Sequence, residues 1–124
     1  MLSHKKIDAD KDYLQQLLND YVQPYNISKL DVRIDNNNLI AEMDIKNNHL
    51  KFSMEYNQYN QQYSHVGFYM NNKYSCPSII GAQTYTIDEC ASQLTDLIQQ
   101  IYYNNGKPNI VSLATPTRGN IHYF

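Results

Sequence analysis

The sequence predicts a single α+β domain over residues 1–124, with an N-terminal helix, an antiparallel meander of four or five strands, a long second helix and a short C-terminal strand or tail. Two patterns predict this fold class. Apolar residues recur at helical spacing near both ends of the chain, and between these segments they alternate with polar residues, as in half-buried strands. The chain length limits the number of domains to one, because 124 residues can bury a hydrophobic core but are too few to form two stable domains.

The first element is expected to be a helix from about Asp10 to Gln23. Asp10 can cap its start, and Pro24 stops it because proline cannot continue a helix. The apolar residues at helical spacing are Leu14, Leu17, Leu18, Tyr21 and Val22.

The second helix is expected to begin with a capping box, in which Thr86 is followed three residues later by Glu89. It should end around Asn105, where Gly106 and Pro108 supply stop signals. Its apolar side consists of Ile87, Cys90, Ala91, Leu94, Leu97, Ile98 and Ile101.

Asparagine pairs are expected to close the first two hairpins, because asparagine tolerates the positive φ that tight hairpin turns need. Turns at residues 36–37 and 47–48 would bring the alternating apolar residues of the first three strands onto one face, with Ile40 left on the other. In this register Met43 lies opposite Phe52. We expect both helices to cover the apolar face of the sheet.

A loop at residues 57–62 should lead into a fourth strand, in which Phe68 opposes Phe52. A further turn at residues 71–72 would return Tyr74 along the sheet edge. Keeping the alternation of that fifth strand requires a bulged loop.

The other face of the sheet is expected to meet solvent as a mixed-charge surface, with Asp44 opposite Lys51 and Glu55 opposite His65. A sheet that stacks RNA bases would present two or three aromatic rings there. This face presents the Tyr69 ring, and it presents Tyr74 as well only if the last hairpin is not bulged. The expected outward residues are Asp31, Arg33, Ile40, Glu42, Asp44, Lys46, His49, Lys51, Ser53, Glu55, His65, Gly67 and Tyr69.

Composition excludes several classes of partner. The net charge of −2 and the presence of only two arginines argue against nucleic-acid binding, because a protein that binds nucleic acid must neutralise its phosphates with basic side chains. The acidic start of the second helix, TIDECASQ, also argues against a double-stranded-RNA-binding domain. No apolar run approaches the length of a membrane span, and the N-terminus lacks the apolar core of a signal peptide. We therefore expect a cytoplasmic protein, and the many Asn and Gln residues favour a bacterial or phage source.

The residues that most often carry chemistry form no local motif. The two cysteines, Cys76 and Cys90, have no CxxC spacing and are expected to be reduced thiols. Cys76 with His65 could form a nucleophile and base, but no lysine or arginine lies between Lys73 and Lys107 to lower the thiol pKa. We assign no catalytic residue, no metal site and no cofactor. The histidines, none of them in a metal motif, are His4, His49, His65 and His122.

Two segments are candidate contact sites. The connection SCPSIIGAQTY, residues 75–85, carries adjacent Ile79 and Ile80, and it is either an ordinary loop or a contact loop for a protein or a second copy of the chain. The tail 114–124 follows a short strand expected at 109–113, and it forms either an edge strand or a partner-binding segment. Its candidate contact residues are Arg118, His122, Tyr123 and Phe124.

We expect the protein to be a small protein-binding inhibitor or adaptor, of the kind that bacterial and phage accessory genes encode, which occludes a surface of its partner. The contact candidates are those of the loop and the tail, with Tyr69 on the outward face. The alternative is an oligomeric module that binds a small nucleotide-like ligand through tyrosines and Arg118. An enzyme is the third candidate, after these two binding functions.

Overall fold

The computed structural model describes residues 2–74 and 84–104 of the chain. Two helices, α1 (Leu2–Val22) and α2 (Ile87–Tyr103), accompany one antiparallel sheet whose strands follow chain order. The strands are β1 (Ser28–Asp35), β2 (Asn38–Ile45), β3 (Asn48–Asn57), β4 (Gln62–Met70) and β5 (Lys73–Tyr74). The predicted α+β class and meander are confirmed, whereas the strand expected at 109–113 lies outside the described residues.

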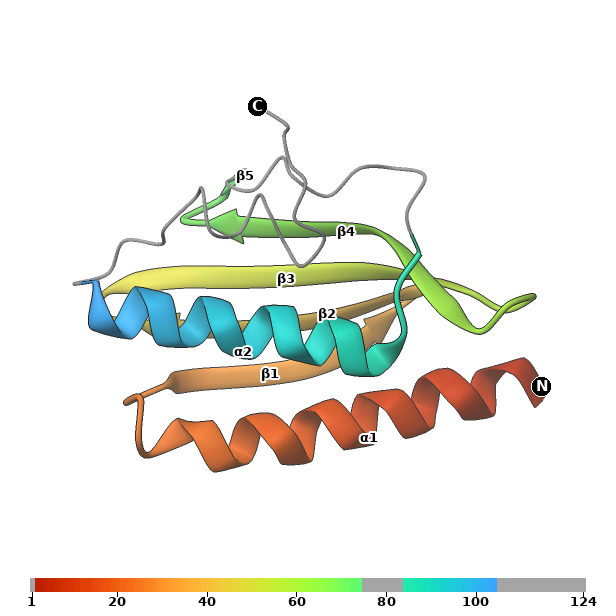
Figure 1. Ribbon diagram of the computed structural model, residues 1–124, viewed down its shortest axis with the longest axis horizontal. Coiled ribbons are helices and arrows are strands. Elements are labelled where there is room, and N and C mark those ends of the chain that lie inside the picture. The colour runs from red at the N-terminus through yellow and green to blue at the C-terminus, as the bar shows by residue number, and fades with distance from the viewer. Residues whose placement is uncertain (1, 75–83, 105–124) are drawn as a thin grey trace.

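Both helices pack against one face of the sheet and enclose a single hydrophobic core (Figure 1). α1 lies along β1, and α2 contacts β2 and β4. The predicted strand phase is confirmed, because alternate residues of the central strands point into this core. The buried residues of β2 and β3 that belong to the core are Leu39, Ala41, Met43, Ile45, Leu50, Phe52, Met54 and Tyr56. The described helices are too short or too polar to cross a membrane.

α1 begins eight residues earlier than predicted, and the expected cap at Asp10 is wrong. Asp10 lies inside the helix and is only 4 % exposed. Its carboxylate accepts a hydrogen bond of 2.7 Å from the Tyr63 hydroxyl and pairs with the Lys6 ammonium at 2.6 Å. The helix extends to its earlier start because Ile7 continues the buried stripe that Leu14 and Leu18 carry.

α2 begins as predicted. Thr86 is the N-cap, its hydroxyl accepts from the Glu89 N–H, and the Glu89 carboxylate accepts from the Thr86 N–H. Six of the seven predicted apolar residues are buried, and Ile87 packs at the edge of the core. The helix ends at Tyr103 with Asn104 as its C-cap.

The second hairpin turn lies at Lys46 and Asn47 rather than at residues 47–48, and both residues take positive φ, 52° and 65°. The β2–β3 register therefore differs by two residues from the prediction, so the expected pairing of Met43 with Phe52 is wrong. A shift of two residues keeps every side chain on its predicted face. The observed partner of Phe52 on β2 is Ala41.

Charge explains why this register is preferred. The predicted register would place Lys46 opposite His49, and its expected pair of Asp44 with Lys51 is not formed. In the structure Asp44 lies opposite His49, and Glu42 lies opposite Lys51. Opposite charges across neighbouring strands stabilise a sheet, whereas like charges destabilise it.

Irregular pairing corrects two further details. A register shift between Ser53 and Glu55 places Ser64 opposite Glu55, although His65 Nδ1 still lies 2.9 Å from the Glu55 carboxylate. The last hairpin is not bulged: Asn71 and Asn72 form a two-residue turn at positive φ. The remaining strand pairing, Phe52 with Phe68, is as predicted. Ile40 and Gly67, expected on the outward face, are buried.

Candidate functional site

Four tyrosines contact one another near the C-terminal ends of the two helices. Figure 1 shows that both helices end at the same end of the molecule. This tyrosine cluster consists of Tyr21, Tyr25, Tyr102 and Tyr103. The Tyr25 ring stacks on Tyr21 with centroids 5.5 Å apart, and it meets Tyr102 edge-on at 5.2 Å. Tyr103 lies 5.1 Å from Tyr102 and is 70 % exposed. These are favourable aromatic geometries, so the rings hold one another in place, with Tyr21 and Tyr25 packed against the edge of the core.

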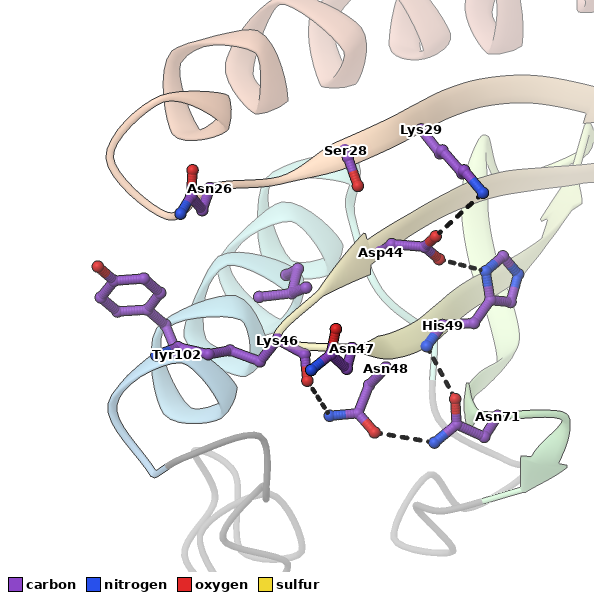
Figure 2. Close-up of a pocket in the computed structure, with 11 residues that line it drawn as sticks. Asn26, Ser28, Lys29, Asp44, Lys46, Asn47, Asn48, His49, Asn71 and Tyr102 are labelled. Carbon is purple, nitrogen blue, oxygen red and sulfur yellow. Dashed lines mark hydrogen bonds and ion pairs between the residues drawn. The ribbon is translucent and has the colours of Figure 1, made fainter.

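A hollow of about 640 Å³ opens beside the tyrosine cluster, between the start of β1 and the turns at the ends of β2 and β4 (Figure 2). We call it the asparagine hollow. Tyr102 belongs to both features, and the Lys46 ammonium lies 4.7 Å from the centre of its ring. The lining residues are Asn26, Ser28, Lys29, Asp44, Ile45, Lys46, Asn47, Asn48, His49, Asn71 and Tyr102.

Asparagine side chains tie together the two turns that border the hollow (Figure 2). The side-chain oxygen of Asn71 accepts a hydrogen bond of 2.9 Å from the His49 backbone N–H. The side-chain nitrogen of Asn71 donates a hydrogen bond of 2.8 Å to the side-chain oxygen of Asn48. Asn48 in turn donates to the Lys46 carbonyl at 3.2 Å. One rim of the hollow is therefore fixed by hydrogen bonds between β3 and the β4–β5 turn.

A chain of alternating charges runs from the hollow across the outward face of the sheet. His49 lies at its centre, with Nδ1 2.7 Å from Asp44 and Nε2 2.7 Å from Glu42. Glu42 also binds Arg33 at 2.6 Å, and Lys29 lies 3.8 Å from Asp44. Because each ring nitrogen faces a carboxylate oxygen, the geometry favours the imidazolium, which donates at both nitrogens.

The pKa values of this charge network shift accordingly. Hydrogen bonds to Glu42 and then to Asp44 raise the pKa of His49 above its ordinary value. The hydrogen bond from His49, aided by Arg33, lowers the pKa of Glu42 although partial burial opposes that shift. The network is therefore fully charged over a wider pH range than the isolated groups would be.

A second polar group, Asp10 with Tyr63, lies inside the core and offers no reactive chemistry. Burial and the hydrogen bond to Asp10 raise the pKa of Tyr63. Burial raises the pKa of the nearby Cys90 thiol to about 12, so this free cysteine stays protonated and is a poor nucleophile. Across residues 2–74 and 84–104, no cluster of His, Cys, Asp and Glu is arranged to hold a metal ion.

The structure places one of the predicted contact residues. Tyr69 is half-buried on the outward face, opposite Lys51, whose ammonium lies 5.5 Å from the centre of its ring. It belongs neither to the tyrosine cluster nor to the hollow lining. The other predicted contact residues lie outside the described residues: Ile79, Ile80, Arg118, His122, Tyr123 and Phe124.

The sequence analysis missed the tyrosine cluster, although a signal was present. Tyr21 and Tyr25 are four residues apart at the end of one helix, and Tyr102 and Tyr103 are adjacent at the end of the other. Only the tertiary arrangement shows that these ends meet. No protein-family model matches the chain, and neither a curated protein nor a solved structure does.

Proposed function

We propose that the protein is a small protein-binding module, an inhibitor or adaptor that covers a surface of its partner. The tyrosine cluster is the observation that carries this proposal. Tyrosine is enriched among the residues that dominate binding energy at protein interfaces. A tyrosine side chain also provides a large, rigid contact area with few rotatable bonds, so it loses little conformational entropy on binding.

The surroundings of the cluster support a protein partner. Interfaces combine an aromatic centre with a polar rim, and here the rim is the asparagine hollow and the charge network beyond it. Lys46 joins the two parts, because its ammonium lies over the Tyr102 ring while its carbonyl accepts from Asn48. The hydroxyl, amide and charged groups of this rim would select the partner by hydrogen bonding and charge.

The predicted tail contacts are part of the same proposal. Residues 105–124 follow Asn104 directly, so the chain that carries Arg118, Tyr123 and Phe124 leaves the described fold next to the tyrosine cluster. A partner seated on the cluster would be within reach of that segment, given about 3.5 Å of extended chain per residue. The partner could also be a second copy of the chain.

Affinity capture with two variants tests this function. The unaltered chain, the double variant Tyr25→Ala/Tyr103→Ala and the control Tyr59→Ala would each be immobilised and exposed to a bacterial lysate, in keeping with the source that we propose. Tyr59 is 91 % exposed and lies in the β3–β4 loop at the other end of the fold (Figure 1). We expect one protein to be retained by the unaltered chain and by Tyr59→Ala but lost from the double variant.

Two results would count against the proposal. Equal retention by all three chains would show that the tyrosine cluster does not contact the partner. Capture of no protein by the unaltered chain, together with a monomeric mass in light scattering, would leave it with neither a foreign partner nor a second copy.

The alternative function, binding of a nucleotide-like ligand through tyrosines and Arg118, stays a proposal because Arg118 lies outside the described residues. The asparagine hollow is a different place where a small ligand could bind, and its lining has a chemistry of its own.

A further inference from the structure

We infer that the asparagine hollow, at the rim of the proposed interface, also binds a small molecule that carries a multiply charged oxyanion, either phosphate or carboxylate. This inference goes beyond the proposed partner binding. The hollow, at about 640 Å³, lies within the range of about 300–1,000 Å³ that is typical of small-molecule sites.

Charge is the first argument. The lining contains Lys29, Lys46 and His49 against one carboxylate, that of Asp44. The His49 ring faces two carboxylates, Asp44 and, just outside the lining, Glu42, a geometry that favours the imidazolium. With Glu42 counted, one positive charge remains in excess at the hollow, although the whole chain has a net charge of −2. In Figure 2 the Lys29 side chain reaches towards Asp44 and the Lys46 side chain runs towards Tyr102, whose ring its ammonium covers. An anion in the hollow would compete with these two contacts for an ammonium group.

The backbone supplies the second argument. Lys29 and Lys46 have φ of 56° and 52°, in the left-handed region where a glycine or asparagine is more stable than a lysine. Lys46 occupies a hairpin turn position for which asparagine, aspartate and glycine are preferred. Both lysines line the same hollow, Lys29 at the irregular pairing between Ser28 and Asp31, whereas Gln61 and His65 also have positive φ and do not line it. Residues in unfavourable backbone conformations gather at functional sites.

Unused hydrogen-bonding groups are the third argument. The side chains of Asn26, Ser28 and Asn47 line the hollow, and none forms a hydrogen bond with another residue in the described part of the chain. Their amide N–H and hydroxyl groups can donate to oxyanion oxygens.

NMR titration tests the site directly. ¹⁵N-labelled protein would be titrated with pyrophosphate, with citrate and, as an uncharged control, with glucose. We expect saturable shifts of the Asn26 and Asn47 side-chain amides with a dissociation constant below ~1 mM for at least one of the two anions. Saturation by pyrophosphate alone would indicate a phosphorylated ligand, and saturation by citrate alone a carboxylate ligand. Glucose should cause no saturable shift.

Three variants separate a role in binding from a role in the fold. Lys46→Asn keeps a residue that tolerates positive φ but removes the charge, and Asn47→Gly keeps the turn but removes the amide. We expect each to weaken anion binding at least tenfold, and Lys46→Asn to unfold at the same or a higher temperature. The control Lys51→Gln removes a lysine that also lies over a tyrosine ring, and it should bind the anion as the unaltered chain does.

Three results would overturn the inference: no saturable shift with either anion, unchanged affinity in Lys46→Asn, or a clear fall in the unfolding temperature of Lys46→Asn. The last would show that Lys46 is retained for its contact with Tyr102. Failure of this site can be distinguished from failure of the proposed partner binding, because Tyr103→Ala alters the tyrosine cluster without changing a residue that lines the hollow.

Discussion

Aromatic side chains occupy two regions of this protein in opposite ways. In the core, Phe52, Phe68 and Tyr63 are at most 2 % exposed and lie beneath the helices. In the tyrosine cluster, Tyr21 and Tyr25 are half-buried and pack against the edge of the core, whereas Tyr103 is 70 % exposed. The first set excludes water from the fold, whereas the second presents a shaped surface to it. The comparison teaches that ring packing alone does not distinguish a residue that holds the fold from one available to a partner.

The largest effect is expected in the core. Phe52 is 2 % exposed and lies opposite Ala41 and Phe68, so its loss leaves a cavity between three strands. Phe52→Ala should lower the free energy of unfolding by about 3–5 kcal/mol, measured by urea denaturation. A loss below about 1 kcal/mol would show that the buried sheet face is not what holds the fold together.

A smaller effect separates two neighbouring buried tyrosines. The Tyr63 hydroxyl donates to Asp10 at 2.7 Å, whereas the buried Tyr56 hydroxyl has no partner among the described residues. Tyr63→Phe should therefore cost about 1.5–3 kcal/mol, as expected for a hydrogen bond to a charged group. Tyr56→Phe, its matched control, should be neutral or stabilising. Equal losses in the two variants would contradict the role given to Asp10.

The charge network should have the smallest effect on stability, and that effect should depend on pH. The pKa of His49 is raised on folding, so its stabilisation is fully present below its ordinary pKa of 6.5 and is lost as pH rises through the folded value. The pKa of Glu42 is lowered, so its stabilisation is present above its ordinary pKa of 4.5 and is lost as pH falls through the folded value.

Comparison with His49→Gln isolates this contribution. The unaltered chain should be more stable than the variant by no more than about 1 kcal/mol near pH 6, since exposed ion pairs contribute little. That advantage should shrink towards pH 9, as urea unfolding at a series of pH values can show. A constant difference between the two chains over this range would mean that His49 does not stabilise the fold as a cation.

The sequence predicted the inward face well because alternation locates it strand by strand. The predicted β2–β3 register was wrong because a shift of two residues preserves that alternation, and the observed register is favoured by cross-strand charge pairs, Asp44 with His49 and Glu42 with Lys51. For the same reason the charge network could not be derived in advance. Asp10 resembles a helix cap locally, and its buried bond to Tyr63 joins residues that are distant in the chain.

The candidate site was less predictable than the fold. A tyrosine near a helix end is compatible with the edge of a core, and the meeting of the two helix ends depends on how both pack on the sheet. The asparagine hollow likewise combines β1, two hairpin turns and α2. Asn47, Asn48 and Asn71 were predicted as turn residues, and that role does not reveal which turns come together.

The most direct test of the central claim, that the tyrosine cluster serves recognition rather than the fold, is to measure both properties of Tyr103→Ala. Urea unfolding should show a loss below about 1 kcal/mol, because the side chain is largely exposed. Titration calorimetry with the captured partner should show binding weakened by at least ~2 kcal/mol. A variant that loses stability as Phe52→Ala does, while binding its partner as tightly as the unaltered chain, would contradict the claim.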